Sequence, residues 1–200
     1  MIMPISPIWP AATAVNAEGS IEFHGRTAES LLDEFGSPLY LIDTDEVVAC
    51  ARHFVRAAAE AFNTSTTHVS FAGKAFLSKE VVRLVTEAGM FVDTCTMGEM
   101  KIALAAGVPG RRLVLHGNNK SDEEIALAIE QGFAKIVIDE PDEPERVAAI
   151  ARKLGKRRGT GVGRIVLANH DDVVIDIGVG ERGGVLALGR DGHTGAHAID

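Results

Sequence analysis

The sequence is poor in cysteine and in positive charge, and each shortage excludes a class of protein. It holds two cysteines, Cys50 and Cys95, in 200 residues. Two cysteines are too few for a disulfide-stapled secreted fold, so we expect buried free thiols in a reducing cytoplasm. The formal net charge is −8, whereas a protein that binds nucleic acid carries a basic face, so no nucleic-acid partner is expected.

Long apolar runs are also missing. No stretch of 18 apolar residues occurs, so the chain is not expected to cross a membrane. The first twenty residues lack a basic segment followed by a continuous apolar core, so no signal peptide is expected. The chain has 46% hydrophobic and 24% charged residues, the composition of a globular domain with a sizeable core.

Residues 1–37 are predicted to form an N-terminal leader. Residues 1–25 carry Pro4, Pro7 and Pro10 and show no periodic pattern, so we expect them to be irregular. A short helix is predicted in "TAESLLDEFG", where Gly36 ends it.

Residues 38–156 alternate regularly between apolar runs and amphipathic helical patterns. Strands are predicted at 38–43, 67–73, 90–95, 112–117 and 134–139, and helices at 44–62, 78–89, 97–107, 121–132 and 143–155. Thr44, Ser78 and Ser121 are the expected N-caps, and Ser121 with Glu124 has the spacing of a capping box. The strands are continuous apolar runs, so both faces of the sheet are expected to be covered. A repeat of roughly 22 to 25 residues predicts parallel strands with right-handed crossovers, either in a doubly wound sheet or in part of a (β/α)8 barrel.

Residues 157–200 differ from the rest of the chain. They are rich in glycine and show no amphipathic helix, although short strands are possible at 163–168 and 173–177. "RRGTGVGR" at 157–164 is a weak phosphate-loop pattern because no helix follows it. His193 and His197 have the spacing of two metal ligands on a helix, but no helix is predicted there, so no metal is expected.

Polar residues gather where the predicted strands end. For any one of them, an ordinary loop or capping role remains open. Together they follow four neighbouring strands, and in an α/β barrel the active site is built at this edge. The candidates are Lys74, Asp93 with Glu99, His116 with Asn118, and Asp139.

Lys74 is the sharpest candidate because Gly73, Ala75 and Phe76 flank it. An apolar setting disfavours the charged form of a lysine, and a neutral amine reacts with an aldehyde. Pyridoxal phosphate (PLP) enzymes use such a lysine to bind their cofactor. The alternative is a lysine that extends to solvent or forms a salt bridge.

Three segments resemble one known family. "FAGKAF" is similar to its cofactor-lysine segment, "VDTCTMGEMKIALAAG" to its acidic block, and "LVLHGNNKS" to its His-Gly-Asn-Asn-Lys-Ser block. From about residue 7 to residue 156 the chain resembles the diaminopimelate decarboxylases, fold-type III PLP enzymes with an alanine racemase-like barrel. The resemblance implies the first half of a (β/α)8 barrel over residues 38–156.

The resemblance also implies a function and roles for the candidates. Lys74 matches the lysine that binds PLP covalently, and Asp93 and His116 match residues near the cofactor. Glu99 and Asn118 match positions that shape the substrate pocket. The implied reaction is decarboxylation of meso-2,6-diaminopimelate to L-lysine, by a cytoplasmic homodimer in the family as a whole.

Residues 157–200 do not show the continuation of the family pattern. The glycine triplet for the PLP phosphate, the Glu-Pro-Gly-Arg segment and the Cys-Glu-Ser strand are not found, and "VVIDIGVGERGG" only faintly resembles the triplet. We therefore expect a truncated, inactive form with an irregular tail, for which the family's homodimer is not expected. The alternatives are a non-enzymatic PLP-binding protein and an interaction fragment that pairs with a full-length chain.

Overall fold

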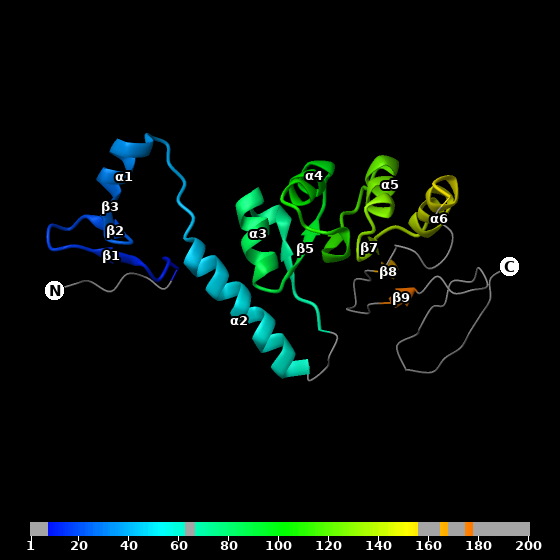
Figure 1. Cartoon of the computed structure of the whole chain (residues 1–200), viewed down its shortest axis with the longest axis horizontal. Coiled ribbons are helices and arrows are strands. Elements are labelled where there is room, and N and C mark those ends of the chain that lie inside the picture. The colour runs from blue at the N-terminus through cyan, green and yellow to red at the C-terminus, as the bar shows by residue number, and fades with distance from the viewer. Residues whose placement is uncertain (1–7, 63–66, 156–164, 168–174, 178–200) are drawn as a thin grey trace.

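The computed structural model describes residues 8–62, 67–155, 165–167 and 175–177, which form an elongated molecule (Figure 1). A small N-terminal sheet lies at one end, and a larger parallel α/β unit makes up the rest. Helix α2 (Thr44–Phe62) joins the two, and it packs on the first helix of the larger unit. None of the described helices is both long and apolar enough to cross a bilayer.

The N-terminal unit is a three-stranded antiparallel sheet followed by a helix. Its strands β1 (Thr13–Val15), β2 (Ile21–Phe23) and β3 (Arg26–Thr27) pair in chain order, and α1 (Ala28–Phe35) follows. The predicted short helix is confirmed, but the expectation of an irregular stretch over 1–25 is wrong for the described part of it. The missed signal is His24-Gly25, which takes positive φ at both residues (49° and 73°). A two-residue hairpin loop of type I′ requires this conformation at both positions.

The predicted strand at residues 38–43 is wrong. This segment has no strand assignment, and Tyr40 is 92% exposed. Its apolar residues have no partner strand among the described residues, and an apolar run needs one to become a buried strand. The expected cap Thr44 is also wrong, since Asp43 is the residue whose carboxylate accepts the Glu46 N–H (3.0 Å) at the start of α2.

The parallel sheet confirms the predicted alternation from residue 67 onward. Its strands are β4 (Ser70–Ala72), β5 (Phe91–Thr94), β6 (Leu113–Leu115), β7 (Lys135–Ile138) and β8 (Ile165–Leu167), and the helices between them are α3 (Lys79–Glu87), α4 (Met97–Ala105), α5 (Asp122–Glu130) and α6 (Glu143–Lys153). The spatial order is β4-β5-β6-β7-β8-β9, parallel as far as β8 and antiparallel from β8 to β9 (Ile175–Ile177). The predicted caps Ser78 and Ser121 are confirmed, and the capping box of Ser121 with Glu124 is complete. The weak phosphate loop at 157–164, the faint glycine pattern from 178 onward and the two histidines at 193 and 197 lie outside the described residues.

Helices α3 to α6 line one face of the sheet (Figure 1). Side chains on that face are buried, among them Val92, Ile136 and Ile138, whereas Asp93 and Val137 on the other face are only half-buried. The expected coverage of both faces is therefore wrong for β5 and β7, whereas it holds for β6, in which Leu113, Val114 and Leu115 are all buried. A sequential parallel sheet with helices on one face is the arrangement of a (β/α)8 barrel, whose inner face is covered only when strands close opposite it. A doubly wound sheet would carry helices on both faces.

Candidate active site

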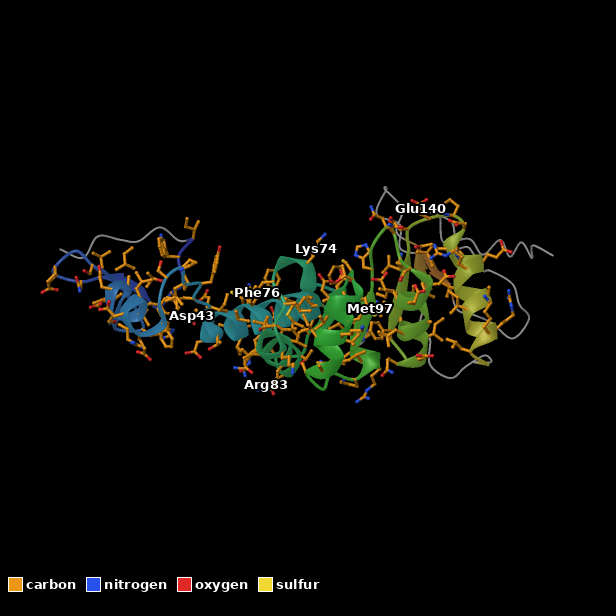
Figure 2. The ribbon with its side chains drawn as sticks, turned by 90° about the horizontal axis from the view of Figure 1, so that it is seen from above. Asp43, Lys74, Phe76, Arg83, Met97 and Glu140 are labelled. Atoms are coloured by element: carbon orange, nitrogen blue, oxygen red, sulfur yellow. The ribbon has the colours of Figure 1, made fainter. Side chains whose placement is uncertain are left out.

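The register of the sheet brings the ends of β4, β5 and β6 to one edge. Ala72 pairs with Asp93, and Thr94 pairs with Leu115. The His116 N–H then donates to the Thr94 carbonyl (2.8 Å). The candidates Lys74, Asp93 and His116 therefore lie at one carboxyl edge, as the repeat predicts. Figure 2 shows Lys74 and Glu140 on one side of the ribbon and Arg83 on the other.

Lys74 lies in a short 3-10 turn, Gly73–Ala75, that directly follows β4. Its side chain is exposed, so the apolar burial expected from its neighbours is wrong for the described residues. The neighbouring Gly73 is buried, and a Cβ placed there would lie 2.8 Å from the Asp93 carbonyl oxygen. Glycine at position 73 therefore lets the turn pack against the end of β5, and this packing fixes the position of the Lys74 backbone.

Asp93 and His116 contact each other at this edge. The distance from His116 Nδ1 to Asp93 Oδ2 is 3.2 Å, and both side chains are only partly exposed. Burial raises the pKa of Asp93, and the His116 contact and the charge of Lys74 oppose that rise. The second oxygen, Asp93 Oδ1, is buried and has no hydrogen-bond partner among the described residues. A buried acceptor without a partner is costly, so this oxygen is available to a donor at the site.

Glu99 is held by a backbone hydrogen bond, whereas Asn118 is exposed to solvent. Glu99 lies in the first turn of α4 and accepts a hydrogen bond from the Cys95 N–H, so its carboxylate holds the loop after β5. Asn118 is exposed at the tip of the loop after β6, and Asp139 is exposed after β7. The pocket roles of Glu99 and Asn118 stay predictions.

The two cysteines do not form a disulfide. Both are free thiols, and Cys95 is half-buried beside the site while Cys50 is exposed on α2. The expectation of burial is therefore wrong for Cys50. Burial raises the pKa of the Cys95 thiol, with the carboxylates of Asp93 and Glu99 adding to the effect, so this thiol is held in its protonated form.

Sequence reasoning missed a buried ion pair beneath the edge. Lys120 Nζ lies 2.9 and 2.8 Å from the two carboxylate oxygens of Glu143, and the side chains are 0% and 1% exposed. Glu124 is a second unforeseen link, since it accepts the Met97 N–H (2.7 Å) as well as closing its own capping box. The sequence signal that could have predicted this ion pair is the position of Lys120 and Glu143, since each directly follows the loop at the end of a strand.

The chain matches the sequence model of one family over residues 49–170. That family is described as "Pyridoxal-dependent decarboxylase, pyridoxal binding domain". The match includes Lys74, Asp93 and His116, and it extends through β8.

Curated relatives carry one name. The chain is 40% identical to the diaminopimelate decarboxylase of Mycobacterium tuberculosis over 148 residues, which are 74% of this chain and 32% of the relative. It is 37% identical to the diaminopimelate decarboxylase of Bacillus subtilis over 126 residues, 62% of this chain and 28% of the relative. The chain thus spans about a third of the length of the curated relatives it matches.

Solved structures agree with the sequence relatives. The diaminopimelate decarboxylase of M. jannaschii superposes with a TM-score of 0.65 at 26% identity, over 72% of this chain and 33% of that one. A lysine/ornithine decarboxylase from Vibrio vulnificus, complexed with putrescine, gives 0.54 at 27% identity, over 70% and 34%. Decarboxylases named for different substrates therefore share this arrangement of strands and helices.

Proposed function

Because the chain belongs to the pyridoxal-dependent decarboxylase family, we propose that Lys74 binds PLP covalently and that the protein decarboxylates meso-2,6-diaminopimelate to L-lysine. The observation that carries the proposal is the meeting of Lys74, Asp93 and His116 at the carboxyl edge of a parallel sheet. The substrate follows from the relatives, which are diaminopimelate decarboxylases.

The residues present fit PLP. Lys74 offers an exposed primary amine, the group that condenses with the cofactor's aldehyde. Asp93 Oδ1 is a buried acceptor without a partner among the described residues, and a hydrogen-bond donor of the bound cofactor would satisfy it. We therefore assign Lys74, Asp93 and His116 to cofactor binding, with Glu99 and Asn118 near the substrate.

When bound, PLP supplies the electron sink for the pair left behind as carbon dioxide departs. The chain's own residues bind the cofactor and position the groups around it. Lys74 would hold the cofactor through its exposed amine. In the tautomer that carries its proton on Nδ1, His116 donates a hydrogen bond to Asp93 Oδ2. This bond orients the ring and leaves Nε2 to exchange a proton. Burial raises the pKa of the Asp93 carboxyl, and its contact with His116 opposes that rise.

Covalent trapping tests the assignment of Lys74. The purified chain is incubated with PLP, reduced with borohydride, digested and mapped by mass spectrometry. We expect the reduced adduct on Lys74, its loss in Lys74→Ala, and its retention in Lys79→Ala, which removes an exposed lysine five residues away. Trapping at another lysine, with Lys74→Ala unchanged, would contradict the assignment.

We infer that the 200 residues alone turn over meso-diaminopimelate slowly. Decarboxylation on PLP depends on a pocket that excludes water, and here the amine of Lys74 is exposed and the inner face of the sheet is only partly covered. We expect L-lysine release well below about 1 per second, the low end for typical enzymes. Turnover of about 10 per second would contradict this inference. Covalent PLP without any L-lysine release would favour the alternative of a non-enzymatic PLP-binding protein.

Cytoplasmic location and assembly belong to the same proposal. Cys50 and Cys95 are free thiols, which suits a reducing compartment. The homodimer that the resemblance implies for the family is not expected of these 200 residues alone, and light scattering of the purified chain tests this.

A further inference from the structure

The buried pair of Lys120 and Glu143 links two loops at the carboxyl edge of the sheet. Lys120 ends the loop after β6, and Glu143 begins α6 after β7. Besides its two contacts with Glu143, the ammonium group donates to the Gly117 carbonyl. Glu143 Oε2 also accepts the Asp139 N–H (2.9 Å). Every ammonium proton of Lys120 therefore has an acceptor, although no part of its side chain reaches water.

Stability alone does not explain such a pair. Withdrawing two charges from water carries a large desolvation penalty, and apolar residues of similar volume often serve the fold equally well or better. The exposed pairs of Arg83 with Glu80 and Glu87 carry no such cost, because they lie on the surface of α3. A buried, fully satisfied network favours one arrangement of the groups attached to it.

The group attached to Lys120 is the turn that follows His116. Gly117 has φ 108°, a conformation that side-chain-bearing residues rarely adopt, and a Cβ there would lie 3.3 Å from the Cys95 carbonyl oxygen. The Lys120–Gly117 hydrogen bond closes this turn across residues 117–120. Because His116 directly precedes the turn, the orientation of its peptide depends on that closure. His116 then contacts Asp93 from the neighbouring strand.

We propose that Lys120 and Glu143 are positioning residues, which hold the turn at 117–120 and through it keep His116 against Asp93 at the candidate active site. The positioning of His116 by Lys120 and Glu143 does not depend on which reaction occurs. Its consequence for catalysis rests on the proposed function. Removal of the pair is expected to loosen the contact between His116 and Asp93 without touching the substrate.

The pKa of Asp93 reports this contact. The charged groups that act on it are His116 and Lys74, which lower it, and Glu99, which raises it together with burial. The test compares the pKa of the Asp93 carboxyl between the wild-type chain and its variants. NMR of the carbon-13-labelled full chain without PLP measures this titration. The test variant is Lys120→Met/Glu143→Leu, which replaces the pair by apolar groups of similar volume. A second, Lys120→Met/Glu143→Gln, keeps an acceptor for the Asp139 N–H.

The control is Ile150→Val, which shortens a buried side chain of the same helix α6 without touching the turn. We expect the pKa of Asp93 to rise by about one pH unit in both double variants, because they lose the His116 contact, and to stay unchanged in the control. An unchanged Asp93 in a folded double variant overturns the proposal, and so does failure of both double variants to fold, since the pair would then serve the fold alone.

PLP trapping on the same variants separates this proposal from the proposed function. We expect the wild-type chain to trap PLP on Lys74 and the double variants to trap several-fold less. No trapping in the wild-type chain would reject the proposed function and leave the Asp93 titration to decide the positioning role. If all variants trap PLP equally, Lys120 and Glu143 position the His116–Asp93 contact only, and their proposed effect on cofactor binding is rejected.

Discussion

Replacement of Gly73 by alanine is expected to disturb the end of β4 and the lysine beside it. The added Cβ would lie 2.8 Å from the Asp93 carbonyl oxygen and 3.4 Å from Leu77 Cδ1. A backbone oxygen in a sheet cannot move as a side-chain end does, so the turn must shift. Overpacking of this kind costs about 1 to 3 kcal/mol, and the reduced freedom of the unfolded chain offsets about 0.4 to 1 kcal/mol of it. The expected net loss is about 1 to 2 kcal/mol.

Urea unfolding followed by circular dichroism measures this loss, and Gly98→Ala is the matched control. At Gly98, in the first turn of α4, the nearest atom to an added Cβ is Thr96 Oγ1 at 3.8 Å, an ordinary contact. Alanine there is expected to stabilise the chain by up to about 0.5 to 1 kcal/mol. The two variants should therefore move in opposite directions, and Gly73→Ala should also trap less PLP on Lys74. Equal stabilisation by both variants, with Lys74 trapped as in wild type, would refute the close-packing explanation of this edge.

Three further predictions concern the scaffold and its titrating groups. Gly110→Ala is expected to cost more than about 3 kcal/mol, because its Cβ would lie 1.8 Å from the Gln131 carbonyl oxygen; urea unfolding and soluble yield measure this. Asp93 has a raised pKa because it is buried, so the folded state favours its protonated form. The stability of the wild type relative to Asp93→Asn should therefore fall as pH rises from 3.8 through the raised pKa. Parallel stability curves of the two proteins from pH 3 to 7 would contradict this. Asp43 has a lowered pKa because its carboxylate accepts the Glu46 N–H, so Asp43→Ala should cost about 1 kcal/mol at neutral pH. This difference should vanish as pH falls through the lowered pKa, and a loss that stays constant with pH would contradict the prediction.

The helices and two of the three expected caps could be predicted because their signals are local, whereas the cap of α2 was misplaced by one residue. Ser78 and Ser121 lie one turn before apolar positions at helical spacing, and their side chains accept the expected N–H groups. The shared edge of Lys74, Asp93 and His116 followed from the repeat length, since parallel strands of one sheet end at the same side. The order of the strands did not, because the repeat fitted both a doubly wound sheet and part of a barrel.

The failures share a different cause, because each depends on what lies opposite a residue. Residues 38–43 are apolar enough for a buried strand but have no partner strand in the described part of the chain. Lys74 has apolar neighbours in sequence, yet nothing among the described residues covers its side chain. The pairing of Lys120 with Glu143 joins residues 23 positions apart, and no periodic pattern marks it.

The regular register of the parallel sheet has a consequence for how the chain assembles. Ser70 pairs with Phe91, Val92 with Leu113 and Val114 with Lys135, so each pairing joins residues 21 positions apart. From β4 to β7 each strand docks beside the one before it in the chain, and the entropy of loop closure is the same small cost at each of these steps. Such low contact order favours rapid, stepwise assembly from the N-terminal side during synthesis. Lys74, Asp93 and His116 all lie on strands up to β6 or directly after them, so the candidate site edge is complete before β7 joins the sheet.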